Sequence, residues 1–213
     1  MQEVKIKVCG LTRPEDIRAV NRLMPDYIGF VFWEKSRRNV TSALAASLKK
    51  ELDPRIQAVG VFVDAPVKVV SDLLNRGIID IAQLHGHEDE EYIRNLREMT
   101  EKPLIRAFQI RSEEQAETTL EEAKKSTADY VLIDSGMGSG KAFNWELLKD
   151  FPRKYFLAGG LDAENVRDAV EMTGASAVDV SSNVETDGVK DEKKVEDFIA
   201  ATRNKAGMEG ESI

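Results

Sequence analysis

Residues 56–84, IQAVGVFVDAPVKVVSDLLNRGIIDIAQL, contain one complete strand–helix–strand unit. The apolar run Ile56–Val63 predicts a strand, Pro66 opens a helix, and Gly77 is a natural residue to end it. Asp80–Leu84 predicts the next strand. Both strands are continuously apolar rather than alternating, which is typical of a parallel sheet whose outer face is covered by helices.

The same unit recurs along the whole sequence, so that eight strand–helix units are expected. Strands are predicted at Val4–Cys9, Tyr27–Phe32, Ile56–Val63, Asp80–Leu84, Pro103–Phe108, Tyr130–Asp134, Tyr155–Ala158 and Ala177–Val180. Helices are predicted at Pro14–Leu23, Ser42–Leu52, Pro66–Asn75, Asp89–Met99, Glu113–Lys125, Trp145–Asp150, Ala163–Met172 and from Glu192 to about Asn204. Ser112 and Gln115 have the spacing of a capping box at the fifth helix.

Eight units predict an α/β fold in which one domain forms a closed (β/α)₈ barrel, the TIM barrel, for which about 200 residues is the lower limit. An open doubly wound sheet would use fewer strands and a glycine fingerprint after the first strand, where this chain has Cys9-Gly10-Leu11-Thr12. No linker divides the 213 residues, so we expect a single domain over 1–213 with a frayed tail at 207–213.

Composition narrows the classes of partner. The formal net charge of −8 disfavours nucleic-acid binding, and any anionic ligand must meet a local positive site. The single cysteine excludes an internal disulfide and favours a reducing cytoplasm. No signal-peptide pattern is present, and no apolar run approaches the roughly 18 residues of a membrane span. We expect a cytoplasmic protein with a small-molecule ligand, and leave open whether it forms a homodimer.

The active site of such a barrel lies at the C-terminal ends of its strands, which turns the strand predictions into candidate residues. Cys9 ends the first strand, where it is either a buried small hydrophobe or, as a thiolate, a nucleophile or base. Asp134 ends the apolar run Tyr130–Asp134. Burial there would raise its pKa and suit a general acid, although it could instead cap nearby backbone N–H groups.

Glycines and serines after the last two strands suggest a phosphate site, because barrels often bind phosphate there. They are Gly159–Gly160 and Ser181–Ser182, whose backbone N–H groups a phosphate could approach. The segment Gly136–Lys141 resembles an ATP-binding loop only superficially, because Ser135 stands at its first glycine and Ala142 at its Ser/Thr. We predict instead that this segment is a mobile cover over the barrel mouth.

Charged side chains near other strand ends are further candidates. Arg37 and Arg38 are either solvated or able to grip a carboxylate with two hydrogen bonds. Asp64 follows the third strand, and His85 ends the fourth, where it either lines the mouth or satisfies backbone groups. His87 is expected in a loop, and the two histidines show no metal-binding spacing, so we expect no metal site.

Eight segments in order resemble the phosphoribosylanthranilate isomerase family over almost the whole chain, and the first and last are the most distinctive. They are KVCGLT at 7–12, GFVF at 29–32 with SRR at 36–38, VGVF at 59–62, QLHG at 83–86, ID at 133–134, GSGK at 138–141, LAGGL at 157–161 and VDVSS at 178–182.

The resemblance implies an Amadori rearrangement in L-tryptophan biosynthesis that needs no cofactor. N-(5-phosphoribosyl)anthranilate becomes 1-(2-carboxyphenylamino)-1-deoxyribulose 5-phosphate, an aldose–ketose isomerisation. Asp134 then matches the general acid, Cys9 the general base, and Arg38 the arginine that holds the anthranilate carboxylate. The residues that match the family's phosphate-binding positions are Gly159, Gly160, Ser181 and Ser182. His85 and Asp179 match positions near the substrate.

Efficient proton transfer would require the pKa of Asp134 to rise toward 7 and that of Cys9 to fall toward 7, the latter through a positive local potential. The chain also departs from the family pattern. Asn183 stands where glycine is common, Asn144 replaces a frequent aspartate, and the segment between Asp134 and Gly138 is short. These differences lie in loops beside the inferred chemistry.

Three other functions remain open. Indoleglycerol-phosphate synthase relies on strand-end lysines, which are absent here from the strand-one and strand-six positions. A histidine-pathway isomerase has aspartate where Cys9 stands. A non-catalytic phosphate-binding barrel would have no reason to keep Cys9 and Asp134 at opposing strand ends.

Overall fold

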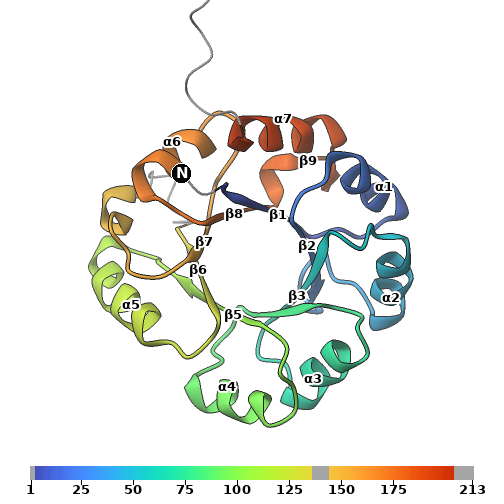
Figure 1. Cartoon of the computed structure of the whole chain (residues 1–213), viewed down its shortest axis with the longest axis horizontal. Coiled ribbons are helices and arrows are strands. Elements are labelled where there is room, and N and C mark those ends of the chain that lie inside the picture. Colours follow the sequence, from blue (N-terminus) through green and yellow to red (C-terminus); the bar gives the residue numbers. More distant parts are fainter. Residues whose placement is uncertain (1–2, 136–143, 204–213) are drawn as a thin grey trace, which may run out of the picture.

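The structure, a computed structural model, describes residues 3–135 and 144–203 and contains a closed barrel of eight parallel strands (Figure 1). The predicted (β/α)₈ fold is therefore confirmed. The strands are β1 Lys5–Cys9, β2 Tyr27–Phe32, β3 Gln57–Phe62, β4 Ile81–Leu84, β5 Leu104–Gln109, β6 Tyr130–Asp134, β7 Tyr155–Ala158 and β8 Ala177–Val180. Each strand pairs with the next in sequence, and β8 pairs with β1 to close the barrel.

Helices surround the barrel as an outer ring in Figure 1. The α-helices are α1 Pro14–Leu23, α2 Ser42–Glu51, α3 Val67–Asn75, α4 Glu90–Arg97, α5 Glu113–Lys125, α6 Val166–Thr173 and α7 Glu192–Arg203. Two 3₁₀ turns are η1 Trp145–Leu148 and η2 Ser182–Val184, and a short antiparallel hairpin joins β9 Glu185–Thr186 to β10 Val189–Lys190. None of the helices in the two described ranges is long and apolar enough to cross a membrane.

Most predicted boundaries lie within one or two residues of the observed ones, and the exceptions have local causes. The helix expected at Ala163 begins only at Val166, because the Asp162 carboxylate accepts the N–H groups of Glu164 and Asn165 and holds a turn there. The predicted helix from Trp145 is the single 3₁₀ turn η1.

The predicted capping box at α5 is wrong. Ser112 does occupy the N-cap position, but its side chain makes no capping hydrogen bond. The backbone carbonyl of Ser112 instead accepts the N–H of Gln115 at 3.2 Å. The first turn is therefore held by the main chain.

The floor of the barrel is filled by apolar side chains. Its interior cluster consists of Val59, Ile81, Ile105, Leu132, Phe156, Ala158 and Ala177. Tyr27 and Tyr130, which begin β2 and β6, pack edge-on against Phe156 with ring centroids 5.4 and 6.0 Å away. Because the N-terminal end of the barrel is closed in this way, polar side chains inside it gather toward the C-terminal ends of the strands.

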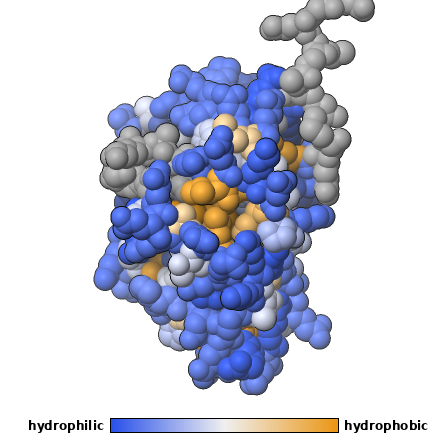
Figure 2. Space-filling view, turned by 90° about the vertical axis from the view of Figure 1, so that its left-hand side faces the viewer, coloured by the Kyte–Doolittle hydropathy of each residue, from blue (hydrophilic) through white to orange (hydrophobic). Residues whose placement is uncertain are grey.

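The outer surface is mainly hydrophilic on the side that Figure 2 shows, where α5 and α6 lie. One apolar area interrupts it near the centre of that view. A hydrophilic outer ring around an apolar interior agrees with a composition in which 32% of the residues are charged.

Candidate active site

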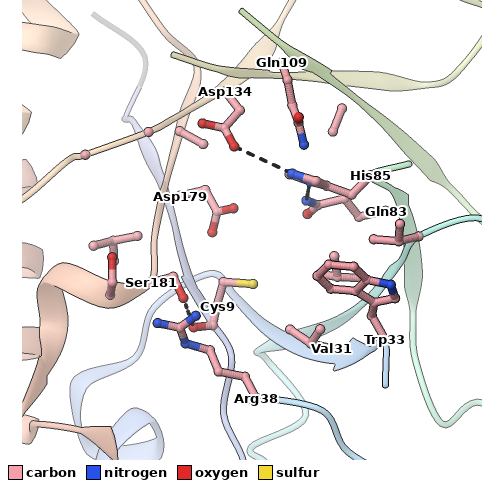
Figure 3. A pocket seen from close by; sticks show the side chains of 18 of the residues that line it. Cys9, Val31, Trp33, Arg38, Gln83, His85, Gln109, Asp134, Asp179 and Ser181 are labelled. Atoms are coloured by element: carbon pink, nitrogen blue, oxygen red, sulfur yellow. Dashed lines mark hydrogen bonds and ion pairs between the residues drawn. The ribbon is translucent and has the colours of Figure 1, made fainter. Parts of the chain in front are cut away.

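A cavity of about 890 Å³ opens at the C-terminal ends of the strands, and each of the eight strands contributes to its wall (Figure 3). All nine residues predicted to act on a ligand line it: Cys9, Arg38, His85, Asp134, Gly159, Gly160, Asp179, Ser181 and Ser182. Asp64 and Arg37 are not among the lining residues. His87 lies at the rim, highly exposed, with Nδ1 3.0 Å from an oxygen of Asp64.

The candidate acid and base face the same space. Cys9 ends β1 and Asp134 ends β6, and Figure 3 shows both side chains directed into the cavity with Asp179 between them. Gly29 on the neighbouring strand gives Cys9 its room, because a Cβ there would lie 2.6 Å from the Cys9 Sγ. A ligand that fills the cavity would thus meet a thiol and a carboxyl group on different sides.

Lys7, which is fully buried, forms an ion pair next to Cys9 with Asp179, whose side chain is 9% exposed. Lys7 is opposite Asp179 in the pairing of β1 with β8, and its Nζ lies 2.9 Å from Asp179 Oδ2. The other oxygen, Asp179 Oδ1, is buried without a hydrogen-bond partner in the described part of the chain. Lys7 was missed from the sequence, although a lysine within an apolar strand was a signal. It lies two residues before the end of β1, so the strand-end position is still Cys9.

Burial and the charges of their neighbours together set the pKa values of Cys9, Asp179 and Lys7. It raises the pKa of the Cys9 thiol, against the opposing effect of Lys7, so the lowered pKa expected for Cys9 is not found and the resting side chain is a thiol. Burial also raises the pKa of Asp179, again against Lys7. For Lys7 itself burial is outweighed by Asp179 and Cys9, which keep its pKa above the ordinary value and its ammonium charged.

His85 connects a buried amide to the candidate acid. Its Nδ1 lies 2.9 Å from Nε2 of Gln83, which is almost wholly buried, and its Nε2 lies 3.6 Å from Asp134 Oδ2. The contact with Gln83 directs the other edge of the imidazole toward Asp134. His85 therefore lines the mouth of the barrel, which is one of the two positions predicted for it.

The loops after β7 and β8 form the candidate phosphate site. Gly159 and Gly160 have φ of 99° and 70°, and a Cβ at Gly160 would meet nothing within 4 Å, so glycine is required there by backbone conformation. The Ser181 hydroxyl donates to the carbonyl of Cys9 at 3.0 Å, which fixes the start of the second loop next to the end of β1. Asn183, at the position where glycine is common, donates to Leu161 and ties the two loops together.

Arg38 lies beside Cys9 and Ser181 in the wall of the cavity (Figure 3). Its Nε and Nη2 donate to the two oxygens of Glu185 at 2.6 and 2.8 Å, while the exposed Arg37 reaches Glu185 at 3.2 Å. A Cβ at Gly10 would lie 2.4 Å from Arg38 Cδ, so a larger residue at position 10 would clash with the Arg38 side chain. Trp33, 38% exposed, also lines the wall, and Figure 3 shows it near Val31. Sequence reasoning missed both Glu185 and Trp33.

Three further expectations concern loops and metals. Asn144 Oδ1 accepts the N–H of Glu146 at 3.1 Å, so the asparagine caps η1 as an aspartate would. The predicted cover at 136–141 and the predicted frayed tail at 207–213 lie outside the described residues. Among the residues that the structure does describe, no cluster of three His, Cys, Asp or Glu side chains is placed to hold a metal ion.

Known proteins are similar to this chain in both sequence and fold. The family model for N-(5′-phosphoribosyl)anthranilate (PRA) isomerase matches residues 6–201. N-(5′-phosphoribosyl)anthranilate isomerases from Endomicrobium trichonymphae and Clostridium acetobutylicum are 40% and 43% identical to this chain, each over 94% of it and 98% of the relative.

Solved structures agree with these matches. The phosphoribosyl anthranilate isomerase of Thermotoga maritima is 34% identical and superposes with a TM-score of 0.83 over 93% of this chain and 98% of its own. A structure of such an enzyme in complex with reduced 1-(o-carboxyphenylamino)-1-deoxyribulose 5-phosphate gives a TM-score of 0.81 at 33% identity, with the same coverage of each chain. The chain belongs to the N-(5′-phosphoribosyl)anthranilate isomerase family.

Proposed function

We propose that this protein converts N-(5-phosphoribosyl)anthranilate into 1-(2-carboxyphenylamino)-1-deoxyribulose 5-phosphate in tryptophan biosynthesis. The observation that carries the proposal is the convergence of Cys9 and Asp134 in one cavity that an arginine and a glycine–serine loop pair also line. Family membership supports the same reaction, since the relatives bear the name of this isomerase. A solved relative also binds a reduced form of the product.

The reaction moves protons between a sugar and two side chains. Asp134 protonates the furanose ring oxygen, and the ring opens to a protonated Schiff base. Cys9 removes the proton from C2′, the electron pair moves toward the Schiff-base nitrogen, and the resulting enolamine tautomerises to the ketone. The resting Cys9 is a thiol because it is buried. The cationic Schiff base brings a positive charge beside it, so the thiol proton is released to solvent through the open cavity and the resulting thiolate removes the C2′ proton.

The two ends of the substrate require different anchors. Arg38 binds the anthranilate carboxylate, and Trp33 and Val31 offer an apolar surface in the same cavity for the aromatic ring. The loops at Gly159–Gly160 and Ser181–Ser182 bind the phosphate through backbone N–H groups. Anchors of this kind explain how a protein with a net charge of −8 holds a ligand with two anionic ends.

The proposal is tested by following consumption of freshly prepared phosphoribosylanthranilate by its fluorescence, with EDTA present and no cofactor added. Wild type is compared with Cys9→Ser and Asp134→Asn, after circular dichroism has shown that all three are folded. Rapid consumption by wild type, nearly abolished in both variants, is the expected result. Activity that survives both substitutions would refute the assigned acid and base, and a folded but inactive wild type would refute the function.

Domain organisation, assembly and location belong to the same proposal. We propose that residues 1–213 form a single domain, because β1 near one end of the chain pairs with β8 near the other. A homodimer stays a prediction, supported by a Thermotoga maritima relative that is described as dimeric. Light scattering after size-exclusion chromatography measures the oligomeric state directly. The cytoplasmic location likewise stays a prediction.

A further inference from the structure

A buried pair of opposite charges lies outside the groups to which the proposed reaction gives a role. Glu185 on β9 and Lys190 on β10 face each other in the register of the hairpin, and their side chains form an ion pair of 2.7 Å with only 4% of each exposed. The turn between them contains Asp187 and Gly188, with φ of 52° and 81°, values typical of a tight hairpin turn. The hairpin thus fixes the two side chains relative to each other.

Glu185 reaches from this pair to the carboxylate anchor. Its two oxygens accept the Nε and Nη2 of Arg38 at 2.6 and 2.8 Å. A guanidinium carries five N–H donors in one rigid plane, so occupation of one edge fixes the direction in which the other edge points. A ligand carboxylate must then be met by the edge that contains Nη1.

Lys190 reaches from the same pair to the phosphate loop. Its Nζ donates to the carbonyl of Ser181 at 2.9 Å and to Glu185 Oε1 at 2.7 Å. Ser181 begins the loop proposed to bind phosphate, and its hydroxyl in turn donates to Cys9. One ammonium group therefore connects the phosphate loop with the carboxylate that orients Arg38.

We propose that Glu185 and Lys190 are positioning residues that fix the distance between the two anion anchors, and so select ligands that carry both a phosphate and a carboxylate. The inference rests on the proposed function, because it takes Arg38 and the Ser181–Ser182 loop as those anchors. Burying two charges is costly, and apolar side chains can often replace such a pair without loss of stability. The presence of a charged pair at this buried position is explained if Glu185 holds Arg38 while Lys190 holds the Ser181–Ser182 loop.

The test compares two ligands on three variants. The reduced product analogue carries both anionic groups, and ribulose 5-phosphate carries the phosphate without the carboxylate. The variants are Glu185→Gln, Lys190→Met and the matched control Glu192→Gln. Glu192 also accepts two hydrogen bonds from an arginine, Arg22, at 2.9 and 2.6 Å, but both side chains of that pair are about half exposed.

For Glu185→Gln we expect the dissociation constant of the two-anion analogue to rise by about 10- to 100-fold, as for loss of a charge-assisted hydrogen-bond pair. Binding of ribulose 5-phosphate should change by less than about two-fold, since the phosphate loop is still held by Lys190. In turnover the loss should appear mainly in KM. Lys190→Met should weaken both ligands, and Glu192→Gln should weaken neither.

Isothermal titration calorimetry and a thermal melt separate a positioning role from a merely structural one. A Glu185→Gln variant that binds both ligands like wild type, or weakens both equally, overturns this inference, whatever its melting temperature. In that case the wild type still binds the two-anion analogue and turns over substrate, and the proposed function stands. A folded wild type that binds neither ligand overturns the proposed function and this inference with it.

Discussion

Replacing Lys7 by methionine should destabilise the protein more than any surface substitution. The ammonium of Lys7 is wholly buried 2.9 Å from Asp179 Oδ2, and Asp179 Oδ1 is buried with no partner in the described residues. Methionine keeps most of the volume but leaves the carboxylate without its counter-ion. Removing one partner of a buried ion pair costs about 3–5 kcal/mol. In a domain of this size each kcal/mol lowers Tm by about 2–4 °C, so a fall of about 6–20 °C is expected.

The size of this effect should depend on pH in a defined direction. Burial already raises the pKa of Asp179, and loss of Lys7 raises it further. A carboxyl group whose folded pKa exceeds its unfolded value of about 3.9 destabilises the fold increasingly as pH rises between those two values. The gap in Tm between wild type and Lys7→Met should therefore narrow as the pH is lowered from 7 toward 4.

Thermal unfolding followed by circular dichroism measures the effect in wild type, Lys7→Met, Asp179→Asn and the double variant. The double variant should be more stable than the sum of the single losses predicts, because it contains no unpaired buried charge. A Tm loss below about 2 °C for Lys7→Met, or strict additivity in the double variant, would show that the pair is not the buried, mutually dependent unit described above.

Four further predictions concern the cavity. Because burial raises the pKa of Cys9, kcat/KM should still be rising with pH above pH 8, and a profile that is flat from pH 6 would contradict the role of Cys9 as base. Gly29→Ala should lower kcat by about 100-fold, because the new Cβ would lie 2.6 Å from the Cys9 Sγ and displace it. Circular dichroism should show that the variant is folded. An unchanged kcat would show that Cys9 need not keep its position. Gly160→Ala should cost about 1–2 kcal/mol in urea unfolding through its φ of 70° alone, and Gly160→Asn should cost less. Dialysis against EDTA should leave kcat unchanged, and activity restored only by a divalent metal would be incompatible with the proposed acid–base chemistry.

The fold could be predicted because its signal is repeated. Eight apolar runs alternate with helical patterns, and a parallel barrel brings all the strand ends to one mouth. Cys9 and Asp134 could therefore be assigned to one cavity although 125 residues separate them in the sequence.

The parts that could not be predicted depend on register or on very short elements. The partner of Lys7 is set by the pairing of β1 with β8, which no local pattern encodes. Glu185 and Lys190 lie on strands of two residues, too short to show any periodicity. The pKa of Cys9 depends on how completely the side chain is buried relative to the charges around it, and the sequence shows the charges but not the burial.

The pairing of β1 with β8 also has a consequence for synthesis of the chain. Cys9 leaves the ribosome early, but its neighbours Asp179 and Ser181 are translated about 170 residues later. Contacts between such distant positions form late, since closing a long loop must precede them. A nascent barrel with seven strands in place would hold the proposed catalytic thiol beside an open gap, so competence for catalysis should arrive abruptly when the eighth strand docks.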